Sequence, residues 1–338
     1  MRRFALFASA LIVATSISAQ APSGLKLQTR FPVAGAEGWD YITVDSDARR
    51  LYVAHGVRVN VLDADTGAQQ GTIEDTPGVH GVAIAPASKH GFTSNGKENK
   101  VSIFNTSDNS LIKKIEVGKG PDGIYYEAAS NRVFTNNHGS HDITAIDATD
   151  GEIVGTVAVG GDGEGAVVGK DGLIYVALED KNELCAFDPK TLEVKRHIAL
   201  QGITAPTGLA ADKKNNRFFV GGHNKMALVI NGATGKAIAS FPTGAGTDAA
   251  EWDARNKLAF ISNGDGTITV IHEKSANEFV ALDPIATQAS AKTMAFDKKT
   301  SKIFLPAATV VVIPALDPAQ KPKRSITEGT FAVLVVGK

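Results

Sequence analysis

The sequence has little cysteine, little aromatic content and no excess of charge of either sign. Its single cysteine, Cys185, excludes an internal disulfide, so packing must hold the fold together. Lys and Arg total 35 against 36 Asp and Glu, and basic residues nowhere cluster with interleaved aromatics. This balance disfavours a nucleic-acid partner and attachment to an anionic membrane. Long stretches of Ala, Leu, Glu and Lys are also missing, which predicts little helix.

The chain has one pronounced apolar run, and it lies at the very start. Arg2 and Arg3 precede the apolar residues 4–17, and Ala19 suits the last position before cleavage. The run is shorter than the roughly 20 residues that a bilayer requires. We therefore expect a signal peptide at residues 1–19 and a single domain at residues 20–338. The mature protein should be periplasmic or secreted, monomeric and without a membrane span.

What the sequence has in abundance is a repeated turn. In each unit a turn follows the second strong strand. These turns begin at Asp63, Asn105, Asp147, Asp188, Asn231 and His272, so the successive gaps are 42, 42, 41, 43 and 41 residues. A short polar side chain followed by Gly, as in Asp63 with Gly67, is typical of a tight hairpin turn with a bulge. A period near 42 residues is typical of β-propeller blades.

An aromatic residue in the preceding strand marks seven units, at Tyr52, Phe92, Phe134, Tyr175, Phe219, Phe260 and Phe304. Four strands per unit predict an all-β fold, a seven-bladed β-propeller of four-stranded antiparallel blades. The seventh unit is complete only if the chain ends meet, with residues 25–33 as its outer strand and residues 331–337 as its third strand. Residues 309–313 are the alternative third strand. A ring closed by the N- and C-terminal strands leaves no open sheet edge.

Several segments resemble a known repeat. The stretches "RLYVAHGVRVNVLDADTG", "NRVFTNNHGSHDITAIDATDGEIVGTVAVGG" and "LIYVALEDKNELCAFDPKTLEV" are similar to the YVTN-type β-propeller repeat family, of the secreted YncE-like kind. The similarity covers nearly the whole chain after residue 19. It implies the propeller fold and a place among surface-layer and periplasmic proteins, but it implies no particular activity.

Propeller geometry selects the candidate site residues, because the first strand of each blade lines the channel and the second runs back to the same mouth. The positions that open the first strands are Asp40, His80, Asp122, Glu164, Thr207, Asp248 and Lys292. A second, looser ring is expected at the ends of the second strands, from His55, Asn95, Asn137, Glu179, His223 and Asn263. We expect both rings to line one channel mouth.

Carboxylates, imidazoles and amides that converge on one cavity can bind a divalent metal. Calcium fits if oxygen atoms dominate, and zinc or another transition metal fits if His55, His80 and His223 take part. Crowded carboxylates would also shift one another's pKa values, as acid–base catalysis requires. The competing interpretation is a solvated polar lining with no defined chemistry. His138 and His141 are expected at a solvated hairpin tip.

Three functions follow from this site. The first is a propeller that binds a small ligand or a protein partner at its channel mouth, without turnover. The alternative is a metal-assisted hydrolase of lactones or similar small esters. An oxidoreductase with a channel-bound cofactor ranks third. Catalytic motifs such as Gly-x-Ser-x-Gly are absent, so the sequence leaves open whether the protein is an enzyme, and it implies no cofactor beyond the candidate metal.

Overall fold

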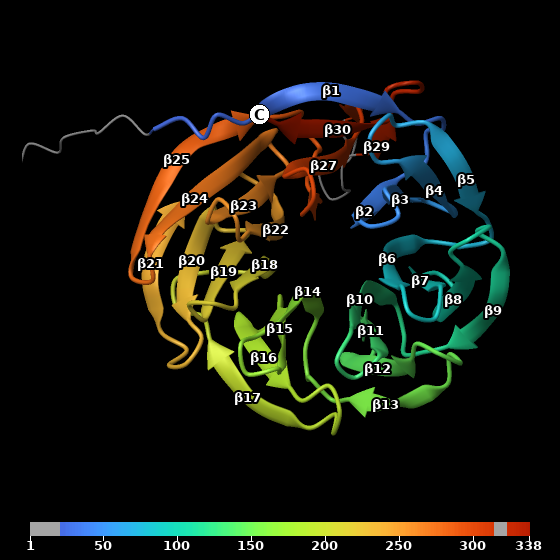
Figure 1. The fold of residues 1–338 in the computed structure, drawn as a ribbon, viewed down its shortest axis with the longest axis horizontal. Helices are drawn as coiled ribbons and strands as arrows, with labels where there is room; N and C mark the ends of the chain where they lie inside the picture. Colours follow the sequence, from blue (N-terminus) through green and yellow to red (C-terminus); the bar gives the residue numbers. More distant parts are fainter. Residues whose placement is uncertain (1–20, 314–322) are drawn as a thin grey trace, which may run out of the picture.

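The computed structural model describes residues 21–313 and 323–338 of the 338-residue chain. Seven four-stranded antiparallel sheets stand around a central channel (Figure 1), which confirms the predicted seven-bladed β-propeller. Within the described residues there is no helix, and hence none with the length and apolarity needed to cross a membrane. The expected signal peptide, residues 1–19, lies outside the described residues.

Each blade runs outward from the channel in chain order. Blade one contains β2 (Trp39–Asp45), β3 (Arg50–His55), β4 (Arg58–Asp63) and β5 (Gln69–Ile73). Blade two contains β6 (Val79–Ala85), β7 (His90–Asn95), β8 (Lys100–Asn105) and β9 (Leu111–Glu116). Blade three contains β10 (Pro121–Glu127), β11 (Arg132–Asn137), β12 (Asp142–Asp147) and β13 (Ile153–Val157).

The next three blades repeat this order. Blade four contains β14 (Gly163–Val168), β15 (Ile174–Leu178), β16 (Glu183–Phe187) and β17 (Val194–Ala199). Blade five contains β18 (Pro206–Asp212), β19 (Arg217–Gly222), β20 (Met226–Asn231) and β21 (Ala237–Pro242). Blade six contains β22 (Thr247–Asp253), β23 (Leu258–Asn263), β24 (Thr267–Ser275) and β25 (Glu278–Ala286).

Blade seven joins the two ends of the chain. It contains β26 (Ala295–Asp297), β27 (Lys302–Ala307), β30 (Ala332–Gly337) and the N-terminal β1 (Lys26–Pro32), in the spatial order β1-β30-β27-β26. The predicted closure by residues 25–33 and 331–337 is therefore confirmed. Residues 309–313 do not supply the third strand, because β28 (Val310–Ile313) pairs with β29 (Lys323–Ile326) in a separate two-stranded sheet.

The core lies between the blades. The second and third strands of each blade are buried on both faces, because each sheet packs against two neighbouring sheets. The outermost strands, such as β5, consist mainly of exposed and partly exposed residues. The aromatic residues that mark the seven units are all buried, and Phe304 packs with Leu51 and Val53 of blade one. This packing explains why the marker aromatics recur once per blade.

One predicted turn is wrong. In blade six the third strand does not end at His272, which pairs with Val280 inside a longer β24–β25 hairpin. The extension carries Phe279 to an edge-on contact with Phe219 of blade five, with ring centroids 6.0 Å apart. The guanidinium of Arg217 also donates to the carbonyl of Ala276, at 2.7 Å. These contacts with blade five stabilise the longer hairpin, and a periodic pattern does not reveal them.

Candidate functional site

The strand-opening positions are fixed by hydrogen bonds between adjacent blades. The hydroxyl of Ser94 on β7 donates to the carbonyl of Asp122, and the hydroxyl of Ser262 on β23 donates to the carbonyl of Lys292. Asn136 on β11 donates in the same way to the carbonyl of Glu164, at 2.7 Å. Asp122, Glu164 and Lys292 are thus each held at the backbone by the preceding blade.

The first strands are also irregular at this end. In β14 the pairing with β15 shifts register between Gly163 and Ala166, and the other first strands from β2 to β22 shift at the equivalent place. Glycine often follows the opening residue because neighbouring strands come close there. A Cβ added to Gly208 would lie 2.8 Å from the carbonyl carbon of Ala249. The close approach of neighbouring first strands at these glycines brings the polar side chains that precede them toward one another.

Six of the seven strand-opening residues meet in one cluster, as predicted. Lys292 Nζ lies 2.8 Å from Asp248 Oδ2 and 3.6 Å from Asp40 Oδ1. His80 Nδ1 lies 2.7 Å from Asp40 Oδ2 and 3.7 Å from Asp122 Oδ2. Glu164 completes the series on the side of blade four. We call this end of the channel, with these groups, the acidic mouth.

Two members of the acidic mouth were not predicted. His138, on the loop after β11, was expected at a solvated hairpin tip, but its Nε2 lies 3.3 Å from Glu164 Oε1 and its Nδ1 lies 3.9 Å from Asp122 Oδ2. Tyr41 on β2 donates a hydrogen bond of 2.9 Å to Glu164 Oε2, from blade one to blade four. His138 directly follows the strand-end residue Asn137. A polar residue at that position, one residue beyond the end of the second strand, is the sequence signal that could have identified it.

Burial and mutual repulsion raise the pKa values of three carboxyls of the acidic mouth, those of Glu164, Asp122 and Asp248. Burial, with the charges of Asp122 and Asp248, raises the pKa of Glu164 to about 9, although the Tyr41 hydrogen bond opposes the shift. Burial likewise raises the pKa of Asp122, with the charge of Asp40 adding to it, while His80 and His138 act in the opposite direction. Glu164 is therefore largely neutral at pH 7.

The pKa values of the cationic members are raised as well, which keeps these groups charged. Burial disfavours the charged imidazole of His80, but its hydrogen bond to Asp40 and the charge of Asp122 prevail and raise its pKa. Burial also opposes the charge on Lys292, yet Asp248 and Asp40 raise its pKa. Asp248 itself has a raised pKa because burial outweighs the nearby Lys292. The acidic mouth thus holds both proton donors and stably charged groups.

The predicted second ring does not line the mouth. The side chains of His55, Asn95, Asn137 and Asn263 are buried and bond within their own blades. Asn95 donates to Ser102 Oγ at 2.7 Å, and Asn137 donates to Thr144 Oγ1 at 2.9 Å. A side chain at the end of a buried strand points between blades rather than into the channel, and an amide there bonds across to the third strand.

Three further predicted residues lie apart from the cluster. Thr207 is buried and donates to the carbonyl of Thr247, at 2.9 Å. His223 and Glu179 form a pair at 3.6 Å, both partly exposed. The charge of Glu179 still contributes to raising the pKa of Glu164, so it lies near the mouth without joining the network of contacts.

The acidic mouth offers two overlapping sets of metal donors. Asp40, His80 and Asp122 each present one ligand atom within 4.8 Å of the others, and Asp122, His138 and Glu164 do the same. Tyr41, Glu164 and Asp248 also line a channel cavity of about 210 Å³. Asp122 belongs to both sets, so it is the centre of the arrangement. Carboxylate and imidazole in this mixture suit a transition metal.

Two other candidates in the described chain are less favourable. His141, Asp162 and Asp180 form a third set of potential donors, but it lies on the outer surface, where the His141 side chain is 54 % exposed. Cys185 is buried among apolar residues of blade four, and burial raises the pKa of its thiol to about 12. Such a thiol is a core residue and not a nucleophile.

Solved structures that share the fold come from unrelated sequences. The chain is similar to a hydrazine synthase structure from Kuenenia stuttgartiensis, with 16% identity, a TM-score of 0.69 and coverage of 81% of this chain and 94% of that chain. It is also similar to a mitotic checkpoint complex chain, with 14% identity, a TM-score of 0.71 and coverage of 97% and 99%. The RRP9 WD40 repeats give 8% identity, a TM-score of 0.75 and coverage of 95% and 99%. Identities this low show the fold alone.

The sequence comparisons give a family but no individual relative. No curated protein sequence matches the chain. A family model described as outer membrane protein assembly factor BamB matches residues 55–315, which is well over half of the chain and includes most of the seven blades. The protein therefore belongs to the family of the outer membrane protein assembly factor BamB.

Proposed function

We propose that the protein is an extracytoplasmic binding propeller of the YVTN type whose acidic mouth holds a divalent transition-metal ion and presents it to a small ligand or a protein partner, without turnover. One observation carries the proposal: two sets of donors, from blades one to four, share the carboxylate of Asp122. Burial of these groups makes them costly unless something compensates their charge. A metal ion supplies that compensation.

The donor types favour zinc over calcium. Two imidazoles, His80 and His138, belong to the sets, whereas calcium takes oxygen ligands alone. Lys292 holds Asp40 and Asp248 on one side of the mouth and would repel a cation there. The metal would therefore lie on the opposite side, near Asp122, His138 and Glu164. Metal binding there would displace the proton of Glu164.

The location and partner class rest on different support. Residues 1–19 have the pattern of a signal peptide, and the family is described as an outer membrane protein assembly factor. Both support a periplasmic or secreted protein that recognises another protein or a small molecule in the cell envelope. The near-neutral net charge gives no support to a nucleic-acid partner. We propose a monomer, since β1 completes blade seven within the same chain and no second copy is needed to close the ring.

Elemental analysis and zinc titration of the purified chain test the metal site. The expected result is a metal that copurifies, or one equivalent of Zn²⁺ bound in calorimetry, with affinity at least about tenfold weaker in Asp122→Asn and in His138→Ala. The matched control is His141→Ala, which removes an imidazole from the surface donor set and should leave the tight site intact. Equal zinc affinity in the wild type, Asp122→Asn and His138→Ala would refute the proposal.

A metal-assisted hydrolase of lactones or small esters is the second candidate, favoured by Glu164. A carboxyl that is largely neutral at pH 7 beside metal donors and a cavity of about 210 Å³ can act as a general acid toward a leaving group. The residues of this chain would bind and orient the ester, and in this candidate Glu164 would keep that proton instead of ligating the metal. Hydrolysis of a lactone panel that depends on Zn²⁺ and is lost in Glu164→Gln would support it. Zinc binding without any such hydrolysis would leave the binding propeller as the function.

A further inference from the structure

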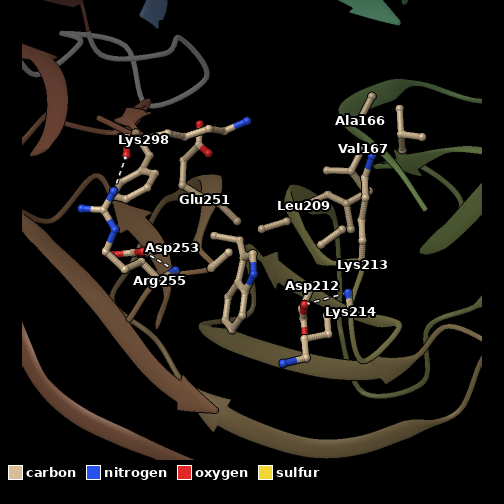
Figure 2. Close-up of a pocket in the computed structure, with 17 residues that line it drawn as sticks. Ala166, Val167, Leu209, Asp212, Lys213, Lys214, Glu251, Asp253, Arg255 and Lys298 are labelled. Carbon is tan, nitrogen blue, oxygen red and sulfur yellow. Dashed lines mark hydrogen bonds between the residues drawn. The ribbon is translucent and has the colours of Figure 1, made fainter. Parts of the chain in front are cut away.

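The opposite end of the channel holds a second and larger pocket. Its volume is about 730 Å³, and it opens between the loops that join the first and second strands of blades five to seven (Figure 2). Ala166, Leu209, Ala250 and Glu251 line both this pocket and the narrower channel cavity. The pocket is therefore the other mouth of the same channel, and its size is that of a pocket for a small organic molecule.

Four cations surround this pocket without a carboxylate partner. Lys213 and Lys214 come from blade five, Arg255 from blade six and Lys298 from blade seven. Figure 2 shows Lys213 on one side of the pocket and Lys298 with Arg255 on the other. Within the described part of the chain, none of the four forms an ion pair within 4.0 Å. We call this end, with these four residues, the basic mouth.

The carboxylates of the pocket are already engaged. Asp212 accepts hydrogen bonds from the backbone N–H groups of Lys214 and Asn215, at 3.0 and 3.2 Å. Asp253 accepts from the backbone N–H of Arg255 at 2.9 Å and from the side chain of Asn256 at 2.6 Å. Both are nearly fully buried. They hold the loops in place and leave the cations available to a ligand.

The floor of the pocket is apolar and aromatic. Leu209, Ala250, Trp252 and Phe296 line it, and the Trp252 ring stacks on Phe219 with centroids 5.0 Å apart. Stacking fixes the indole in place, so the surface offered to a ligand is flat and preformed. A planar apolar body fits this floor, and a negatively charged group fits the cations around it.

Glu251 adds a proton-dependent element. Burial raises its pKa to about 7, although Lys298 and the backbone N–H of Phe296 act against the shift. The other charged groups that line the pocket are Asp212, Lys213, Lys214, Asp253 and Arg255. Below pH 7 the Glu251 carboxyl is neutral and can donate a hydrogen bond, and above pH 7 its charge offsets that of Lys298.

The geometry points to a binding site for a small organic anion, with a carboxylate, sulfonate or phosphate head held by Lys213 and Lys298 and a planar apolar body against Trp252 and Phe296. This site is separate from the acidic mouth and does not depend on a metal there. It gives the channel two ends of opposite chemistry.

A matched pair of fluorescent probes tests the site. 8-Anilinonaphthalene-1-sulfonate carries a sulfonate on an aromatic body, and N-phenyl-1-naphthylamine has the same rings without charge. We expect the wild type to bind the sulfonate at least about tenfold more tightly than the neutral probe, since Lys213 and Lys298 can both contact the sulfonate and the neutral probe offers them no charge. The double variant Lys213→Ala and Lys298→Ala should bind the sulfonate about tenfold more weakly.

The control is the double variant Lys190→Ala and Lys236→Ala, which removes two exposed lysines from outer hairpins and should leave sulfonate affinity unchanged. Raising the pH from 6 to 8 should weaken sulfonate binding several-fold in the wild type, and Glu251→Gln should remove this dependence. Equal sulfonate affinity in both double variants, or equal affinity of the wild type for the two probes, would overturn the inference.

Discussion

The hydroxyl of Tyr41 on the first blade reaches the carboxyl of Glu164 on the fourth, at 2.9 Å, and so connects opposite sides of the channel. Burial and the charges of Glu164 and Asp122 raise the pKa of the phenol well above its usual value, so Tyr41 stays a donor throughout the working range. This donor stabilises the ionised form of Glu164.

Replacing Tyr41 by Phe should raise the pKa of Glu164 further. The lost hydrogen bond favours the carboxylate, and a bond of this kind to a charged group contributes about 1.5 kcal/mol, which corresponds to about one pKa unit. Carbon-13 NMR titration of the Glu carboxyls measures the shift. Tyr126→Phe, which removes a phenol bonded to Asn131 in the same propeller, is the control. An unchanged Glu164 titration in Tyr41→Phe would show that the contact does not act on the carboxyl.

Zinc affinity at the acidic mouth should increase as the pH rises. The proton must leave Glu164, whose pKa is about 9, before its carboxylate can act as a ligand. Each displaced proton changes the apparent affinity by up to about tenfold per pH unit. Calorimetric titrations at pH 6, 7 and 8 should therefore show increasing affinity with proton release. In Glu164→Gln the slope should fall by about one proton, and an unchanged slope would place the metal away from Glu164.

Glu164→Gln should also remove part of the alkaline loss of stability in the metal-free protein. A pKa of about 9 in the folded state, against 4.5 for the free side chain, means that stability from the neutral carboxyl is full below about pH 4.5 and is lost as the pH rises through 9. The limit is about 1.4 kcal/mol per pH unit, and relaxation around the carboxylate reduces it. Between pH 5 and pH 8 we expect the variant to lose about 2 kcal/mol less than the wild type. Denaturant unfolding measures the difference, and the control is Glu74→Gln, which changes an exposed glutamate outside the acidic mouth.

The fold could be predicted from the sequence because the same turn and strand signals recur from repeat to repeat and all indicate the same structural unit. A turn at Asp63 or Asp147 is weak alone, but the same turn every 42 residues or so, preceded by an aromatic in a buried strand, allows few alternatives. The strand-opening ring followed from the same register. Asp40, His80 and Asp122 meet because equivalent positions of radial sheets face one axis.

The remainder of the site depended on contacts that periodicity does not encode. Asn95 and Asn263 occupy the right register, yet their amides turn between blades to bond Ser102 and Thr269. His138 lies on a loop whose path is set by its own hydrogen bonds, including one from the ring to the carbonyl of Gly163 at 2.8 Å. Tertiary packing decides the direction of side chains at strand ends and in loops. Residue type and spacing therefore predict only which end of the channel a residue lies near, and not where its side chain points.

The contact between the first and last blades, which closes the ring, should be stabilised by the buried ion pair of Arg49 and Asp297. Arg49 of blade one donates to Asp297 of blade seven at 2.7 Å, and Asp297 is fully buried. Burial opposes the charge of Asp297, but hydrogen bonds from Thr300, Ser46 and Arg49 prevail and lower its pKa to about 2. Its contribution to stability is thus present above about pH 4 and is lost as the pH falls through 2.

Arg49→Ala should destabilise the protein by about 2–3 kcal/mol, somewhat less than the 3–5 kcal/mol for a fully buried pair, because Thr300 still bonds Asp297. Urea unfolding at pH 7 measures the loss. Lys299→Ala is the control, because it breaks an exposed, solvent-screened ion pair with Asp47 between the same two blades and should cost much less than Arg49→Ala. At pH 2 the penalty of Arg49→Ala should shrink, since the protonated Asp297 no longer needs a cation. A penalty of the same size at both pH values would mean that Arg49 stabilises the closure by packing and not by its charge.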